Sequence, residues 1–315
     1  MYRLSAEKEL TDEKLSYFIN QHNADISNRL RKLADAYKTK FQILYGPEKP
    51  PWKPDNRIAV NFPKYIVDTM NGFILGNPVK ISIDEGASGI PEYVEMFEQY
   101  NNIDDHNAEL SKICSIFGRG YELLYVDEYS QICTTHVSPM EGFMIFDDSV
   151  LERPRYFVRI YKDEDEIIHG TVSDDTLVRY FSIKGKFEWE DERLHGFDGV
   201  PAIEYVENEE KMGIFEPVLT MIDAYNKAIS EKANDVDYFA DAYLKVLGAY
   251  LDEDDTKHMR DNRIINFDET MASGTLPEVD FLSKPNGDTT QENLINRLEK
   301  LIFQISMVAN INDEN

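Results

Sequence analysis

Apolar residues recur at helical spacing over residues 11–40, which predicts an amphipathic helix there. Its first four residues, TDEK, combine a capping side chain with acidic residues, as is typical of a helix start. A proline-rich break over residues 46–54 ends this helix. Further helices are predicted at residues 61–75, 91–100 and 106–117. The buried face of the first helix is predicted to consist of Leu15, Phe18, Ile19, Ile26, Leu30, Leu33 and Tyr37.

The segment FILGNPVKI, residues 73–81, interrupts the helical pattern. Gly76 and Pro78 are residues that end helices, and the β-branched Val79 and Ile81 follow them. This order predicts a helix that stops near Gly76 and a strand that starts after Pro78.

The pattern changes again at residue 120, where short apolar and β-branched runs alternate with polar turns. This spacing predicts a meandering antiparallel sheet over residues 120–206. The predicted strands are YELLYV, QICTTHV, GFMIF, RYFVRIY, LVRYFSI, KFEWE and PAIEYV.

A long helix is predicted over residues 216–246, where the apolar positions recur without glycine or an interior proline. At 1.5 Å per residue such a helix would be roughly 45 Å long. Its apolar stripe consists of Val218, Ile222, Tyr225, Ile229, Val236, Ala240 and Tyr243. Its opposite face is polar and mainly acidic, with Lys227, Glu231, Asp235, Asp237 and Asp241.

A second helix is predicted at residues 289–308, and the segment between the two helices contains two or three strand-like runs. The two helices therefore resemble a hairpin with a small subdomain inserted at its tip. Their stripes need a surface to pack against, and neighbouring copies of the same chain would supply one. The stripe of the second helix consists of Leu294, Leu298, Leu301, Ile302 and Ile305.

The composition limits the function classes. The chain has 315 residues, with 59 acidic against 33 basic ones and a net charge of −26, so its surface should repel nucleic acid unless the basic groups are segregated. No apolar run is long enough to span a membrane, and no signal-peptide pattern is present at the N-terminus. Cys114 and Cys133 are expected to be buried thiols in a reducing cytosol.

No catalytic, cofactor-binding or metal-binding pattern emerges from the chain. The acidic run of residues 252–255 lacks the ligand spacing of a calcium loop and is interpreted as a solvated turn. Gly118-Arg119-Gly120 is interpreted as a helix end that enters a strand, because no phosphate-loop sequence continues it. The histidines form no metal-binding pair, and no two carboxylates are singled out as a catalytic pair. A structural or interaction role is therefore favoured over an enzyme.

Several segments, in order, resemble the portal proteins of long-tailed bacteriophages. NRIAVNFPKYIVDTMNGFILGNPVKI contains the family's glycine-rich helix end followed by NPV, and FGRGYELLYVDE resembles its next turn, with Arg119 where a small residue is usual. SPMEGFMIFDDS resembles a further segment of the family. The closest likeness, residues 195–248, contains a glycine and an acid before the long helix and then IDAYN and ND. Together the segments cover most of residues 56–308.

The resemblance implies an α+β portal-type subunit with a mixed wing, a stem of two long helices and a small β-containing clip between them. The wing would comprise residues 1–215, the stem helices residues 216–247 and 288–308, and the clip residues 248–287. Residues 309–315 resemble the start of a tunnel-loop region, so the crown that usually follows is expected to be absent from this chain.

The function implied is that of a ring of about a dozen identical subunits, which conducts double-stranded DNA at a capsid vertex of the virion after assembly in the bacterial cytoplasm. The expected partners are the terminase large subunit, a head-completion or adaptor protein, and a scaffold or major capsid protein. The candidate channel or intersubunit residues are Glu231, Asp235, Asp237, Asp241 and Lys245. The candidate docking surface of the clip is Asp252, Glu253, Asp254 and Asp255.

Two alternatives remain open at this point. An acidic DNA mimic or regulatory binding protein would explain the net charge of −26, but not a long helix followed by an inserted subdomain. A hydrolase would need a pair of carboxylates in a cleft. A ring with a central hole, seen by negative-stain imaging, would distinguish the portal from both.

Overall fold

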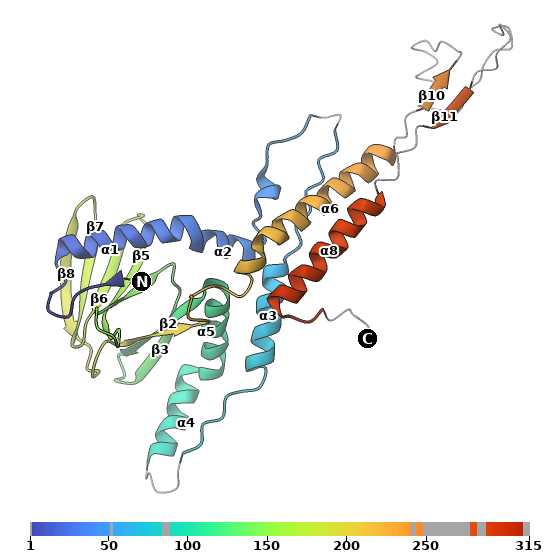
Figure 1. The fold of residues 1–315 in the computed structure, drawn as a ribbon. Helices are drawn as coiled ribbons and strands as arrows, with labels where there is room; N and C mark the ends of the chain where they lie inside the picture. Colours follow the sequence, from blue (N-terminus) through green and yellow to red (C-terminus); the bar gives the residue numbers. More distant parts are fainter. Residues whose placement is uncertain are drawn as a thin grey trace. The chain divides into compact units, whose positions relative to one another are not determined.

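The computed structural model describes residues 2–50, 53–83, 89–240, 244–247, 278–281 and 288–310. The chain forms two compact units (Figure 1). The larger unit comprises Met1–Gln42, Ala59–Asp223 and Lys300–Asn315, and the smaller unit comprises Ile43–Ile58 and Ala224–Glu299. Helices and sheets both occur, which confirms the predicted α+β class.

The helices of the larger unit follow the predicted pattern. The first predicted helix is continuous but contains a π-helical turn, Ile26–Leu30, between α1 (Asp12–Asp25) and α2 (Arg31–Tyr37). Thr11 caps it as expected, since its Oγ1 accepts a hydrogen bond from the Lys14 N–H at 3.3 Å. The other predicted helices are present as α3 (Phe62–Leu75), α4 (Ile90–Asn101) and α5 (Ile103–Phe117).

The segment FILGNPVKI is a helix end without the expected strand. Helix α3 ends at Leu75, directly before Gly76, as predicted. Residues 78–83 form no regular secondary structure, so the predicted strand is wrong. Val79 and Ile81 are both exposed, and none of the described strands pairs with this segment. β-Branched residues alone do not make a strand without such a partner.

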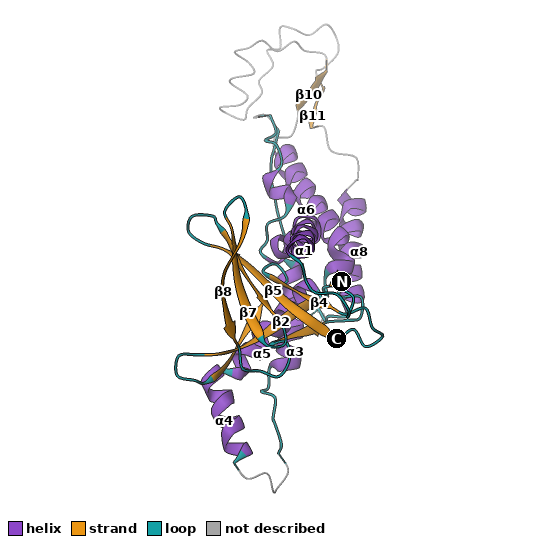
Figure 2. Ribbon diagram, turned by 90° about the vertical axis from the view of Figure 1, so that its left-hand side faces the viewer, coloured by secondary structure: helices purple, strands orange, loops and turns teal. Residues whose placement is uncertain are grey.

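The described strands of the larger unit form two sheets rather than one meander. The six-stranded sheet has the order β1-β4-β5-β6-β7-β8, and the three-stranded sheet has the order β3-β2-β9. Figure 2 draws their strands in orange. Strand β9 pairs with β2, far earlier in the chain, which local patterning could not predict. The bounds are β1 Tyr2–Arg3, β2 Arg119–Val126, β3 Ile132–Val137, β4 Gly142–Phe146, β5 Pro154–Lys162, β6 Ile168–Ser173, β7 Leu177–Ile183, β8 Phe187–Leu194 and β9 Ala202–Val206.

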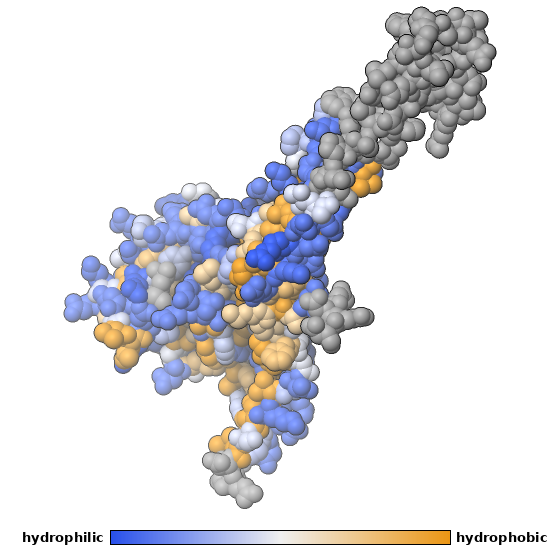
Figure 3. All heavy atoms as spheres, turned by 45° about the vertical axis from the view of Figure 1, so that its right-hand side comes forward, coloured by the Kyte–Doolittle hydropathy of each residue, from blue (hydrophilic) through white to orange (hydrophobic). Residues whose placement is uncertain are grey.

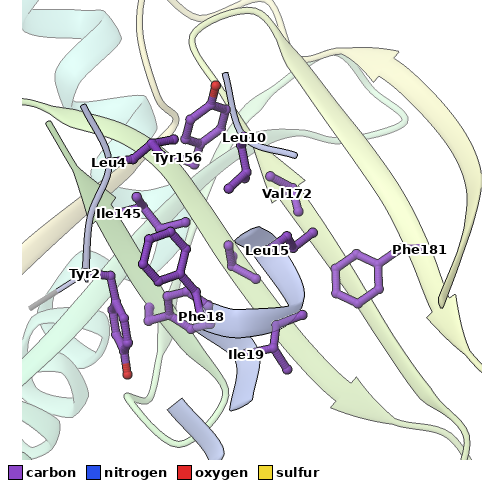
Figure 4. Packing of buried hydrophobic residues seen from close by; sticks show 12 residues of the cluster. Tyr2, Leu4, Leu10, Leu15, Phe18, Ile19, Ile145, Tyr156, Val172 and Phe181 are labelled. Atoms are coloured by element: carbon purple, nitrogen blue, oxygen red, sulfur yellow. The ribbon is translucent and has the colours of Figure 1, made fainter. Parts of the chain in front are cut away.

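Two hydrophobic cores lie on opposite faces of β4 and β5. On one face α1 packs against the six-stranded sheet (Figure 4), and Phe143 and Val158 point into this core. On the other face Met144 and Phe157 pack against Tyr121 of the three-stranded sheet. Strand β4 is therefore buried on both sides, which explains its uninterrupted apolar sequence.

The smaller unit contains the end of α6 (Leu219–Ala240), the strand pair β10 (Leu244–Leu247) and β11 (Glu278–Phe281), and the start of α8 (Asp288–Ser306). The second predicted helix is thus confirmed. The first is shorter than predicted, because residues 244–247 form a strand that pairs antiparallel with β11. Most of the predicted clip, residues 248–277 and 282–287, lies outside the described residues.

Candidate functional site

A charged junction fixes the start of α6 within the larger unit. The Arg29 guanidinium binds both carboxylate oxygens of Glu216, with Nε–Oε1 at 2.8 Å and Nη2–Oε2 at 2.7 Å. Arg29 Nη2 also donates to the carbonyl oxygen of Lys211 at 2.8 Å. Glu216 Oε2 in turn accepts the Gly213 N–H at 3.1 Å. This bidentate pair holds the π-helical turn against the residues that lead into α6.

Two glycines allow the chain to pass close to itself at this junction. A Cβ atom on Gly213 would lie 2.3 Å from the carbonyl oxygen of Ile116, and one on Gly118 would lie 2.0 Å from that of Lys211. Gly118 also has φ +82°, in the left-handed region that side chains disfavour. The glycine and acid that precede the long helix are therefore explained by backbone packing and by the ion pair with Arg29. Gly118 ends α5 and Arg119 begins β2, which confirms the interpretation of that tripeptide.

Arg119 fills the position where the resemblance predicts a small residue. Its side chain is buried, and its Nη2 contacts Asp25 Oδ2 at 3.2 Å. Nearby His22 is fully buried, and burial, with the charge of Arg119, lowers its pKa to about 4. His22 Nδ1 lies 3.2 Å from the Tyr2 hydroxyl. These groups anchor the N-terminal helix from inside.

In the smaller unit, the described part of Ile43–Ile58, here called the strap, is bonded to α6 through polar groups. The Asn56 N–H donates to Asn234 Oδ1 at 2.6 Å, and the Ile58 N–H donates to Ser230 Oγ at 2.9 Å. The Ser230 hydroxyl also donates to the carbonyl oxygen of Asn226 at 2.7 Å. Ser230 and Asn234 are buried one helical turn apart, so they present acceptors in line with the strap backbone.

Arg57 holds the strap in shape. Its guanidinium donates to the carbonyl oxygens of Gly46 at 2.8 Å and Pro47 at 3.0 Å. It also donates to Asp55 Oδ2 at 2.7 Å, and this hydrogen bond lowers the pKa of the Asp55 carboxyl. The strap, which includes the described part of the proline-rich segment, is thus hydrogen-bonded to α6. The sequence predicts only a break between helices at this segment and not this contact.

Three of the predicted channel or intersubunit residues have partners within the smaller unit. Glu231 pairs with Lys49 at 3.4 Å, Asp235 accepts a hydrogen bond from Gln291 at 3.0 Å, and Asp237 accepts one from Asn56 at 2.5 Å. Lys245 lies in β10, opposite Asp280 of β11 in the sheet register, so it is on a strand and not on the predicted helix. Asp241 and the predicted docking residues Asp252, Glu253, Asp254 and Asp255 lie outside the described residues.

The same helices expose part of their apolar stripes. Val236 of α6 is 63% exposed, and Leu294 of α8 is 52% exposed. Ile295, which the predicted stripe omitted, is buried instead. Two large aliphatic side chains of the smaller unit are therefore left open to another surface.

A second exposed apolar surface lies in the larger unit, on the end of α3, the segment after it, and α4. Together these segments are here called the apolar arm, and Figure 3 shows orange apolar side chains along it, at the bottom of the view. The phenylalanine and isoleucine at the end of α3 are exposed, as are apolar residues of α4 spaced three or four positions apart. The exposed residues of this surface are Phe73, Ile74, Val79, Ile81, Ile90, Tyr93, Met96 and Tyr100. FILGNPVKI thus contributes surface rather than chemistry.

Among the described residues, the thiols and histidines lack the arrangement of a metal site. Cys114 and Cys133 are free and buried, as predicted, and burial raises the pKa of Cys114 to about 12. Across the part of the chain that the structure describes, no group of three or more His, Cys, Asp or Glu residues is placed to hold a metal ion. No helix among these residues is long and apolar enough to cross a membrane.

Comparison with known proteins adds a family match. The family model described as phage portal protein, SPP1 Gp6-like, matches residues 15–315. Among solved structures, a chain in the neck of an empty GTA particle computed with C6 symmetry aligns with a TM-score of 0.48 and 12% identity, covering 86% of this chain and 76% of that chain. Comparison with curated proteins gives no match.

Proposed function

The chain belongs to the phage portal protein family, SPP1 Gp6-like, and we propose that it is a structural, non-catalytic subunit of a homo-oligomeric portal ring in the virion. The family match over residues 15–315 carries this proposal, and it confirms the resemblance seen in the motifs. In this reading residues 1–215 form the wing, residues 216–247 and 288–308 the stem, and residues 248–287 the clip. Residues 309–315 begin the tunnel-loop region.

The exposed apolar residues support assembly into a ring. A ring is built from heterologous contacts, in which one surface of a subunit meets a different surface of the next. Val236 and Leu294 lie exposed on the helices assigned to the stem, where a neighbouring subunit would cover them. The apolar arm around α4 would add a contact of the same kind in the wing.

A direct test is the oligomeric state of the purified chain. We expect rings of about a dozen subunits with a central hole in negative-stain images, and a matching mass by mass photometry. A species that stays monomeric or dimeric at every concentration and salt would overturn the ring assignment. The same images would distinguish the portal from an acidic DNA mimic or a hydrolase.

The acids of α6 support a role as a conduit for double-stranded DNA. DNA carries about one negative charge per 1.7 Å of its axis, so a basic channel would bind and retain it. Asp237 bonds the neutral amide of Asn56, so the hydrogen bond does not cancel its charge. Glu231 is exposed although Lys49 lies near it. An acidic stem face of this kind would repel DNA and keep its passage during packaging and ejection smooth.

Reversal of these charges tests the conduit. The double variant Glu231→Lys and Asp237→Lys should slow packaging in a motor assay, with a stronger dependence on salt. The double variant Glu7→Lys and Glu9→Lys, at exposed positions outside the stem helices, makes the same change in net charge and should leave the velocity unchanged. Equal velocities in all three rings would overturn the conduit proposal for these acids.

The clip and the wing would also bind other proteins. The terminase large subunit and then a head-completion or adaptor protein would bind the clip, with Asp252, Glu253, Asp254 and Asp255 as the candidate surface. A scaffold or major capsid protein would contact the wing. Assembly would take place in the bacterial cytoplasm, before the ring becomes part of the capsid vertex.

A further inference from the structure

A groove of about 560 Å³ opens between the two sheets of the larger unit. One wall is formed by β2 and β3 of the three-stranded sheet, and the other by β5 to β8 of the six-stranded sheet. Its volume is within the range of ordinary ligand sites. The larger unit alone supplies all of its lining, so the groove exists in a single subunit.

The groove lies where the two sheets no longer pack directly against each other. Phe157 of β5 packs against Tyr121 in the core, but two residues further along the same face of β5 stands Arg159. The strand register sets Arg159 beside Thr171 of β6, and Thr171 beside Tyr180 of β7. The six-stranded wall therefore presents a row consisting of a guanidinium and two hydroxyls. The opposite wall contributes aliphatic groups such as Leu123.

The guanidinium of Arg159 carries a buried N–H donor that has no acceptor among the described residues. Its Nε atom is buried and has no hydrogen-bond partner among the described residues, and its guanidinium lies 5.2 Å from the ring centre of Tyr161. A buried donor without an acceptor is costly, and a bound carboxylate would satisfy it with a charge-assisted hydrogen bond.

A second arginine lines the same wall. Asp191 Oδ2 accepts a hydrogen bond from Arg193 Nε at 2.9 Å, and the guanidinium lies 5.6 Å from the ring centre of Tyr180. The lining residues of the groove include two arginines against one acid, Glu141. This balance is the reverse of that of the whole chain, with its net charge of −26.

We propose that this groove binds an acidic peptide segment with apolar side chains, contributed by a partner protein. Carboxylates of the peptide would meet Arg159 and Arg193, and its apolar side chains would meet Leu123 and the neighbouring aliphatic groups. A nucleic acid fits less well, because its many phosphates would face a strongly acidic chain with only two arginines at the site. The proposal is independent of ring formation, because the groove lies within one subunit.

Fluorescence anisotropy with a labelled synthetic peptide, in which glutamate alternates with leucine, tests the groove on the full chain. Binding should weaken as the salt concentration rises, and a matched peptide with glutamine in place of glutamate should bind at least about tenfold more weakly. Arg159→Gln should weaken binding of the acidic peptide by about tenfold or more, since a hydrogen bond between charged groups is lost. Arg193→Gln, at a side chain that is 71% exposed, should weaken it with little risk to folding.

Arg3→Gln is the matched control, because Arg3 is an exposed arginine outside the groove that pairs with Glu152. It should leave peptide affinity unchanged, and thermal unfolding should show that all three variants fold. Equal binding of the acidic and glutamine peptides, or equal affinity in all variants, would overturn the proposal. Tighter binding of a single-stranded oligothymidylate that depends on Arg159 would reassign the groove to nucleic acid.

Discussion

The larger and smaller units hold their shapes by different means. In the larger unit Phe143, Phe157 and Phe181 are completely buried, and the largest fully buried side chains of the described residues all belong to it. In the smaller unit the strap meets α6 through the amides and hydroxyl of Asn56, Asn234 and Ser230. Apolar burial is strong but not directional, whereas hydrogen bonds fix geometry with a small net free energy. The described residues of the larger unit are therefore held mainly by apolar burial, whereas the strap is held on α6 mainly by hydrogen bonds.

The largest expected effect on the free energy of unfolding comes from removing a large side chain from the core of the larger unit. Phe157 is 0% exposed between the two sheets, so Phe157→Ala should lower the free energy of unfolding by about 3–5 kcal/mol. Leu294→Ala, at a 52% exposed position in the smaller unit, should change it by about 0.5 kcal/mol or less. Urea denaturation of both full-length variants measures the difference. Similar losses would show that the smaller unit depends on apolar burial as strongly as the larger one.

A second prediction concerns the buried His22 and its dependence on pH. Because its pKa falls from 6.5 in the unfolded chain to about 4, the unfolded chain binds a proton that the folded chain does not in this window. Stability should therefore decrease as the pH falls from 6.5 to 4, with up to about 3 kcal/mol from this residue at 1.36 kcal/mol per pKa unit.

The variant His22→Gln removes the titrating group and isolates this effect. The difference in unfolding free energy between the wild type and the variant should shrink, or change sign, as the pH falls toward 4. A difference that stays constant from pH 7 to 4 would show that His22 does not cause the acid sensitivity of the larger unit.

A third prediction concerns the charged junction at the start of α6. Arg29→Met should cost about 1.5–3 kcal/mol, because it removes the bidentate hydrogen bonds to Glu216. In a double-mutant cycle with Glu216→Gln, the two losses should be strongly non-additive. The exposed pair Arg3–Glu152, treated in the same way, should show a coupling of about 0–1 kcal/mol. Additive losses at the junction would mean that the pair does not act as a unit.

Local periodicity was enough to predict the helices and most of the strands, because each depends on nearby residues. It missed β6, whose sequence IHGTVS is interrupted by Gly170. A Cβ there would lie 2.3 Å from the Phe181 ring, so the glycine makes room for a core side chain from the next strand. The division into two sheets arises because β3 pairs with β2 and not with the following strand β4. The return of β9 to pair with β2 is likewise not encoded in either strand alone.

The candidate site was predicted less well than the fold. Ser230, Asn234 and Asp237 occur at polar positions of a helix, where a solvent-exposed face is the simplest interpretation. Their partners come from the strap, which is distant in sequence and rich in proline, so no periodicity links the two. The apolar stripe from Val236 to Tyr243 also predicts a longer helix than α6. The helix is shorter because residues 244–247 pair with β11, and this strand pairing overrides the local pattern.

The smallest effect on the unfolding free energy is expected at Val236, where a substitution should instead weaken assembly of the ring. Val236→Ser should change the unfolding free energy of the single chain by about 0.5 kcal/mol or less, because the side chain is 63% exposed. In a ring the substitution would remove apolar contacts that the valine side chain makes with the neighbouring subunit. The fraction of rings measured by mass photometry should therefore fall. Val150→Ser, at a fully exposed valine of the larger unit, is the matched control and should assemble like the wild type. If both variants form rings equally well, Val236 faces solvent in the assembly, and the smaller unit does not depend on a neighbour at this position.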